Sequence, residues 1–229
     1  MIKVLIFRPE EKFENINIEG VELINLPIIK LVENDFYLDD FYFDTIIFTS
    51  SFAYSVFKKK IGEKINILKN KRIIAIGEKT AKFIDFPSII PEKQSWEGIV
   101  GLISPKEKVV LVRSSQGNNK LPNELIKKGV MLKVLDVYHE EKFEKNFQEC
   151  CKLIKEGNIY AIIFSSGMIA KTFFELFSKY CGNGKLNTKK IISIGKETSD
   201  ILKKYIDNFI ELEKPDISLA IKLIKNGKI

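Results

Sequence analysis

Residues 46–51 read Ile-Ile-Phe-Thr-Ser-Ser, and residues 162–167 repeat the pattern as Ile-Ile-Phe-Ser-Ser-Gly, at an offset of 116. An apolar run that ends in small hydroxyl residues is typical of a parallel strand that leads into a helix. Three more pairs recur in the same order: 5–8 with 110–113, 20–23 with 129–132, and 73–80 with 191–198. Repetition in the same order, at offsets between 105 and 118 residues, predicts a duplicated α/β unit.

Six short apolar runs predict the strands of this unit, and most of them precede a helical pattern. Strands that alternate with helices form parallel sheets with right-handed crossovers. The predicted fold class is therefore α/β, with two doubly wound parallel-sheet lobes. The expected strands are 4–7, 45–48, 73–76, 109–112, 161–164 and 191–194.

The loops that follow these strands lie at the carboxyl edge of a parallel sheet, where ligands bind. Each loop begins a helix, whose first N–H groups have no acceptor within the helix and attract anions. Two such sheets predict a cleft lined with amides, which suits a ligand with several carboxylates or phosphates. The simpler interpretation is that Ser and Thr only cap helices and that glycine only permits a tight turn. The four loops are 49–51, 77–80, 165–167 and 195–198.

The composition is that of a folded globular protein of 229 residues, with 45% hydrophobic and 29% charged residues. The net charge of +7 favours an anionic partner, but it is scattered, and no basic stripe with interleaved aromatics indicates nucleic acid. No apolar stretch approaches the roughly 20 residues of a membrane helix, and the run 4–7 is too short for a secretion signal. We therefore expect a soluble protein of the reducing cytoplasm.

The sequence offers no site for a metal, a nucleotide or a redox cofactor. Cys150, Cys151 and Cys181 are too few for a disulfide framework and form no C-x-x-C pair. Cys150 and Cys151 lie in a helical pattern, so we expect them to be buried and inert. The single histidine, His139, excludes a multi-histidine metal site and is expected to be an exposed linker residue.

Several nucleotide and hydrolase motifs are missing. No G-x-x-x-x-G-K-[ST] loop occurs, and Arg8-Pro9 stands after the first strand, where a dinucleotide fold needs glycine. No G-x-S-x-G elbow occurs, and a Ser-His-Asp triad would have only His139 as its base.

The order of the motifs resembles uroporphyrinogen-III synthase. The resemblance runs from Val4 to Leu202 through VLIFRP, IIFTSS, IIAIGEKT, EGI, VVLVRSSQG, LPNELIKKGV, VLDVY, IIFSSG and IISIGKETS. It implies that lobe one comprises 1–30 and 140–229 and that lobe two, 33–136, is inserted in it. A short two-stranded connector would join the lobes near 27–32 and 137–141, where Val137-Tyr138 is expected to end a strand.

The resemblance also implies the activity, that of a lyase without a cofactor in tetrapyrrole and haem biosynthesis. The family cyclises hydroxymethylbilane to uroporphyrinogen III: water leaves to give an azafulvene, and a spiro intermediate inverts ring D. Because the substrate carries eight carboxylates and closes unaided to the type I isomer, the enzyme's task is mainly conformational. We expect a monomer that makes transient contact with the upstream hydroxymethylbilane synthase.

The family has a tyrosine at the position of Tyr138, and a phenol can protonate the departing hydroxyl group. Tyr138 is therefore the predicted catalytic residue, although a hinge tyrosine with a polar tip is the simpler interpretation. Thr80 and Thr198 match the family's paired threonines, and the strand-end serines match as well. The predicted substrate-binding residues are Thr49, Ser50, Ser51, Gly77, Thr80, Ser165, Ser166, Gly167, Gly195, Thr198, Arg8 and Lys120.

Two positions depart from the family pattern. Phe52 stands where members often carry Asn or Arg, and the loop 117–120 lacks the arginine that many have. Either Lys120 or Arg113 then supplies that charge. Arg8 and Arg113 end equivalent strands, and each either braces its own loop or contacts the ligand.

Two other functions remain open at this point. One is a noncatalytic two-lobed protein that binds a small polyanion, and the presence of Tyr138 counts against it. The other is a nucleotide-sugar or phosphate enzyme, which would need a specific catalytic carboxylate or histidine. Glu78 and Glu197 occupy different positions in the two repeats, which indicates solvated helix starts.

Overall fold

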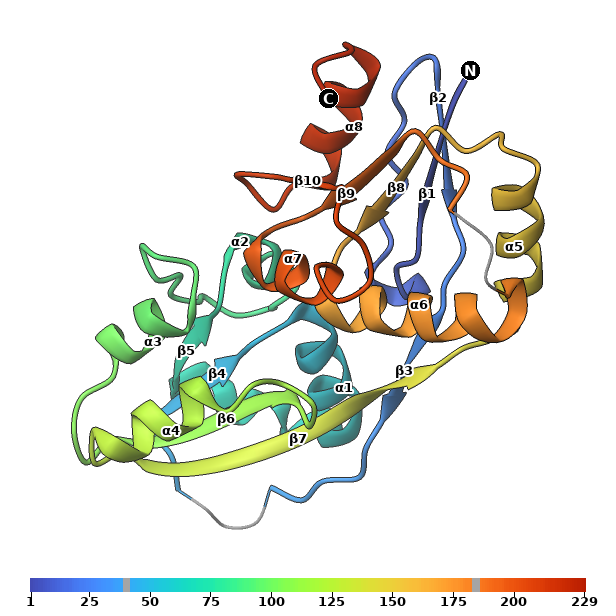
Figure 1. The fold of residues 1–229 in the computed structure, drawn as a ribbon. Helices are drawn as coiled ribbons and strands as arrows, with labels where there is room; N and C mark the ends of the chain where they lie inside the picture. Colours follow the sequence, from blue (N-terminus) through green and yellow to red (C-terminus); the bar gives the residue numbers. More distant parts are fainter. Residues whose placement is uncertain (39–41, 183–185) are drawn as a thin grey trace. The chain divides into compact units, whose positions relative to one another are not determined.

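The computed structural model describes residues 1–38, 42–182 and 186–229, and it divides into two compact units (Figure 1). Unit 1 comprises Met1–Lys30 and Glu141–Ile229, and unit 2 is the continuous stretch Leu31–Glu140. Each unit contains one five-stranded sheet. In the part of the chain that the structure describes, no helix is long and apolar enough to cross a membrane.

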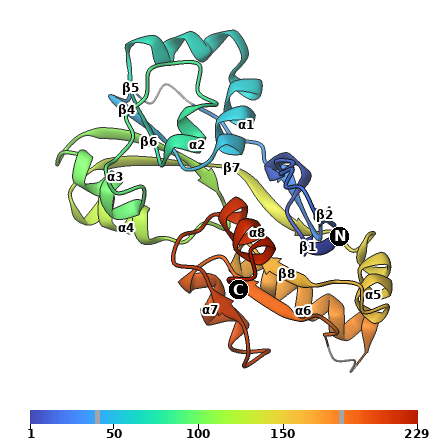
Figure 2. The same ribbon diagram turned by 90° about the horizontal axis from the view of Figure 1, so that it is seen from above.

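Unit 1 has a parallel sheet in the order β10-β9-β8-β1-β2. Helices α5 and α6 lie side by side (Figure 2) and bury Phe147 and Phe173 against one face of the sheet, and α8 buries Ile221 against the other. Apolar side chains on both faces explain why these strands read as continuous apolar runs. The elements are β1 (Ile2–Ile6), η1 (Glu10–Lys12), β2 (Val21–Asn25), α5 (Phe147–Lys155), β8 (Ala161–Phe164), α6 (Gly167–Cys181), β9 (Lys190–Ser193), α7 (Lys196–Leu202), β10 (Ile210–Glu211) and α8 (Ile217–Lys225).

Unit 2 is built in the same way, with a sheet in the order β3-β7-β6-β4-β5. Helix α1 packs Phe57 against one face of the sheet, and α3 and α4 pack Ile99 and Leu125 against the other. The elements are β3 (Ile29–Glu33), β4 (Thr45–Phe48), α1 (Ser51–Ile61), η2 (Gly62–Asn70), β5 (Arg72–Ala75), α2 (Glu78–Ala81), α3 (Trp96–Leu102), β6 (Lys108–Ser114), α4 (Lys120–Lys127) and β7 (Met131–Lys142).

The repeated motifs occupy equivalent places in the two sheets. The order β9-β8-β1-β2 of unit 1 corresponds to β5-β4-β6-β7 of unit 2, strand for strand. All six predicted strands are present, to within two residues at each end, and the parallel α/β architecture is confirmed.

Strand β7 is longer than the sequence predicted, and it pairs with β3 in the antiparallel sense. Asn34 N donates to Val137 O (2.9 Å) and Phe143 N donates to Ile28 O (2.8 Å). The residue numbers rise along one strand as they fall along the other, so the two strands run in opposite directions. The prediction that Val137-Tyr138 ends this strand is wrong, because pairing with β3 extends β7 to Lys142.

His139 lies within β7 and is partly buried, so the expectation of an exposed linker residue is also wrong. Its Nδ1 lies 2.6 Å from Asn34 Oδ1. The hydrogen bond to Asn34, just after β3, gives the ring a structural partner that the sequence did not reveal.

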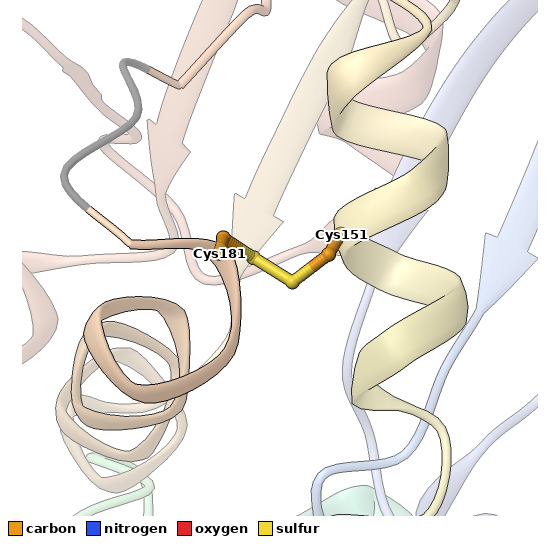
Figure 3. Close-up of a disulfide and its surroundings, with 2 residues drawn as sticks. All are labelled: Cys151 and Cys181. Carbon is orange, nitrogen blue, oxygen red and sulfur yellow. A yellow bond between two sulfur atoms is a disulfide. The ribbon is translucent and has the colours of Figure 1, made fainter.

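A disulfide joins Cys151 of α5 to Cys181 at the end of α6, with the two Cα atoms 5.6 Å apart (Figure 3). The expectation that Cys151 is inert is therefore wrong, because the packing of two helices brings together cysteines 30 positions apart. Cys150 is buried, as predicted, and burial raises the pKa of its thiol to about 12, with the charge of Glu149 contributing. Its thiol therefore stays protonated and unreactive at neutral pH.

Replacing Cys181 with serine should lower the free energy of unfolding by about 3 kcal/mol, because a disulfide restricts the unfolded chain. Chemical denaturation with and without dithiothreitol measures the effect. The reductant should destabilise the wild-type protein and leave Cys181→Ser unchanged. A wild-type unfolding curve that does not respond to reductant would contradict the disulfide.

Candidate functional site

The carboxyl edge of the unit 2 sheet brings Ser50 and Tyr138 together. Strand β6 ends at Ser114, and its pairing with β7 shifts after Arg113, so that Ser114 lies opposite Tyr138. The Tyr138 hydroxyl oxygen then lies 3.3 Å from Ser50 Oγ, across the end of β6.

Tyr138 is buried, with 4% of its surface exposed. Its ring meets the ring of Phe52 edge to face, with 5.0 Å between the centroids, and its backbone oxygen accepts a hydrogen bond from Ser115 N (2.9 Å). The departure at Phe52 thus has a structural role, since an aromatic ring here fixes the orientation of the tyrosine.

The three predicted residues after β4 have different roles. Ser50 caps α1, and its Oγ accepts the Ala53 N–H at 3.0 Å. Thr49 Oγ1 donates to Val112 O at 3.2 Å and so ties the loop to β6. The amides of Ser51 and Phe52 donate to no residue that the structure describes, so they remain available to an anion.

The equivalent loop of unit 1 follows the same plan. Ser166 caps α6 by accepting the Ile169 N–H at 3.2 Å, and the partly buried Ser165 precedes it. Gly167 has a packing role, because a Cβ atom there would lie 3.0 Å from Ile201 Cγ1 on α7. Within the described chain, the Gly167 and Met168 amides have no acceptor.

The turn at Gly77 is covered by the side chain of Gln94. Gln94 Oε1 accepts the Glu78 N–H at 3.3 Å, and a Cβ atom on Gly77 would lie 2.4 Å from that oxygen. Gln94 therefore occupies the position where the sequence predicted a ligand oxygen. Thr80, in the helix that follows, is buried.

The turn at Gly195 is open in comparison. A Cβ atom on Gly195 would meet no atom within 4 Å. Two buried serines fix this turn from beneath: Ser199 Oγ donates to Ser193 Oγ (2.9 Å), which donates to Gly195 O (2.9 Å). The matching positions in unit 2 are Ala75 and Ala81. Thr198, like Thr80, is buried.

The two arginines at equivalent strand ends have different surroundings. Arg113 is buried and braces its loop, with Nε donating to Asp136 Oδ1, Nη1 to Asn118 O and Nη2 to Asn119 Oδ1, each at 3.0 Å. The Arg8 guanidinium makes no hydrogen bond to any described residue. Burial lowers the pKa of Arg8, and the charge of Glu14 opposes this effect. Lys120 is exposed at the start of α4.

Sequence reasoning missed two side chains at this edge, Gln94 and Gln116. Gln116 Nε2 donates to Glu140 O (3.0 Å), and Glu140 N donates to Gln116 Oε1 (2.7 Å), which holds β7 just beyond Tyr138. Gln116 lies within the VVLVRSSQG motif, but its backbone partner is 24 residues away.

The arrangement can bind anions and donate a proton. Within unit 2 the first turn of α1 presents amides for carboxylates and the Tyr138 hydroxyl provides a proton donor, and within unit 1 the first turn of α6 presents amides of the same kind. Among the described residues, no group of three or more His, Cys, Asp or Glu side chains could hold a metal ion.

Comparison with known proteins gives one consistent family. The family model described as uroporphyrinogen-III synthase HemD matches residues 11–221. A protein of Archaeoglobus fulgidus, provisionally named uroporphyrinogen-III synthase, is 30% identical over 241 residues and covers 100% of both chains. A Methanocaldococcus jannaschii protein with the same provisional name is 28% identical, over 89% of this chain and 90% of the other. The crystal structure of uroporphyrinogen-III synthetase from Helicobacter pylori shares the fold, with a TM-score of 0.73 and 20% identity over 99% of each chain.

Replacing Arg113 with lysine should lower the free energy of unfolding by about 2 kcal/mol, because one ammonium group cannot make three divergent hydrogen bonds. Amide exchange in residues 115–119 should accelerate, as read by hydrogen–deuterium exchange. Arg8→Lys is the matched control and should leave that loop unchanged. Equal loop exchange in the two variants would rule out the bracing role.

Proposed function

This chain belongs to the uroporphyrinogen-III synthase family, and we propose that it cyclises hydroxymethylbilane to uroporphyrinogen III, with inversion of ring D. The observation that carries the proposal is the family match over residues 11–221. That stretch contains every residue that we assign to the site except Arg8.

The substrate carries eight carboxylates and closes to the type I isomer when left alone. The enzyme must therefore hold the bilane in a conformation that presents the substituted carbon of ring D. The first-turn amides of α1 and α6 bind acetate and propionate groups, because the positive ends of these helices favour carboxylates. Ser51 and Gly167 supply the first amide of each helix.

Charged side chains also contribute to the binding of the substrate carboxylates. Arg8 remains protonated although burial lowers the pKa of its guanidinium, and it can bind a carboxylate in bidentate fashion. Lys120 supplies the loop charge that the family usually takes from arginine, because Arg113 is engaged within its own loop. Thr80 and Thr198 shape the turns beside the substrate, where Gly77 is covered by Gln94 and Gly195 is open.

Tyr138 acts as the general acid of the reaction. Its hydroxyl group protonates the terminal hydroxyl of the bilane, the C–O bond breaks with its electron pair on oxygen, and water leaves. The resulting azafulvene is attacked by the substituted carbon of ring D, and the spiro intermediate fragments and closes again as the type III macrocycle. No step requires a metal or redox cofactor.

The repeated architecture fits this task. We infer that duplication of one α/β unit produced two sheets with amide-bearing loops at their carboxyl edges, one at α1 and one at α6. A substrate with carboxylates on all four rings suits a protein that presents the same kind of anion site twice.

The test is an isomer assay. Hydroxymethylbilane is made in the reaction mixture by its own synthase, and the oxidised products are separated into type I and type III uroporphyrin by chromatography. The wild-type protein should give mostly type III. Tyr138→Phe should lower the rate of type III formation by about 100-fold, because general acid catalysis is lost.

Tyr205→Phe is the matched control. Tyr205 is exposed in unit 1 and its ring stacks on Phe174, 4.6 Å between centroids, so loss of its hydroxyl should leave the activity unchanged. Formation of type I alone by the wild-type protein, as without enzyme, would refute the proposal. A noncatalytic protein that binds a polyanion would then be the better interpretation.

A further inference from the structure

The hydroxyl group of Ser50 has two neighbours, and together they limit what it can do. Its oxygen accepts the Ala53 N–H of α1 at 3.0 Å and lies 3.3 Å from the Tyr138 hydroxyl oxygen. A serine hydroxyl has one proton and two lone pairs. Because the helix cap uses one lone pair, the proton and the second lone pair of Ser50 both remain for Tyr138, and either hydroxyl group can be the donor.

Electrostatics favours Ser50 as the donor. Ser50 lies at the amino end of an 11-residue helix, where the field disfavours a proton that points toward the helix. A hydroxyl that accepts a hydrogen bond also becomes a better donor. With Ser50 as the donor to the Tyr138 oxygen, the proton of Tyr138 is left for a different acceptor.

We propose that Ser50 is a positioning residue for the proposed reaction, which directs the Tyr138 proton toward the substrate and stabilises the phenolate left behind. The inference rests on the proposed function and assigns Ser50 a role through Tyr138 in place of contact with the substrate. When Tyr138 gives its proton to the departing hydroxyl, the negative charge on its oxygen faces the Ser50 O–H. The phenolate regains a proton when the closing pyrrole carbon loses its hydrogen, so the cycle balances.

Unit 1 contains the matched cap without the tyrosine. Ser166 accepts the Ile169 N–H at the start of α6 just as Ser50 accepts that of Ala53. The stretch after β2, which corresponds to β7, reads Leu-Pro-Ile over residues 26–28 and carries no hydroxyl group. Among the described residues, the capping serine is paired with a phenol in unit 2 and not at the equivalent cap of unit 1.

The kinetic test uses Ser50→Gly, since glycine is tolerated at the N-cap with little loss of stability. Ser50→Gly should lower kcat for type III formation about 10-fold with KM changed less than 2-fold. Ser50→Thr keeps both hydrogen bonds and should restore kcat. In a Tyr138→Phe background, Ser50→Gly should have no further effect, because the residue through which it acts is gone.

Two kinetic results would overturn the proposal. Equal losses from Ser50→Gly in the two backgrounds would mean that Ser50 acts independently of Tyr138. A raised KM at unchanged kcat would mean that Ser50 binds the substrate directly.

A second measurement does not depend on activity. In protein labelled with tyrosine ¹³Cζ, the signal missing from Tyr138→Phe identifies Tyr138, and Ser50→Gly should shift that signal. Ser166→Gly, which removes the equivalent cap from α6, should not. An unmoved Tyr138 signal in Ser50→Gly refutes the inference, whereas failure of the wild-type isomer assay refutes the proposed function alone.

Discussion

The difference in length between β6 and β7 determines the candidate site of unit 2. Strand β6 ends at Ser114, where its pairing with β7 shifts by one residue, and β7 continues to Lys142 beside β3. If both strands ended together, at Ser114 and Tyr138, the residues of β7 that follow Tyr138 would lie beyond the sheet and their backbone would lack partners. Instead Ser115 and Gln116 hold the backbone of β7 from the β6 side, and Asn34 holds it from the other.

The two sheets show how one plan can be adapted to two local purposes. In both units a capping serine follows the equivalent strand, β4 in unit 2 and β8 in unit 1, at the start of a long helix. They differ in what surrounds the glycine turns: serine hydroxyls support Gly195 from within, whereas Gln94 covers Gly77 from outside. They also differ at the arginines, since Arg113 is engaged by its own loop and Arg8 is not.

The strands could be predicted because each is covered on both faces. A strand that is buried on both faces consists of consecutive apolar residues, such as those of 161–164. Strand β7 was predicted too short because its last residues are polar and pair with β3, about one hundred positions earlier. The disulfide depends on how closely α5 and α6 pack together, and no local sequence pattern indicates that distance. Gln94 and Gln116 act through backbone groups far away in the sequence, and the roles of Tyr138 and the loop residues stay predictions.

The order of strands in unit 1 has a consequence for synthesis on the ribosome. Strand β1 lies between β2 and β8, and its Val4 and Leu5 are fully buried there. Strand β1 is made before β8 and must therefore wait for residues 161–164, while all the strands of unit 2 are complete once β7 has emerged. Unit 2 can thus fold as a continuous insert before the sheet of unit 1 is complete. Until β8 is made, the apolar strand β1 lacks this neighbour, and the nascent chain is then most exposed to chaperone binding and to aggregation.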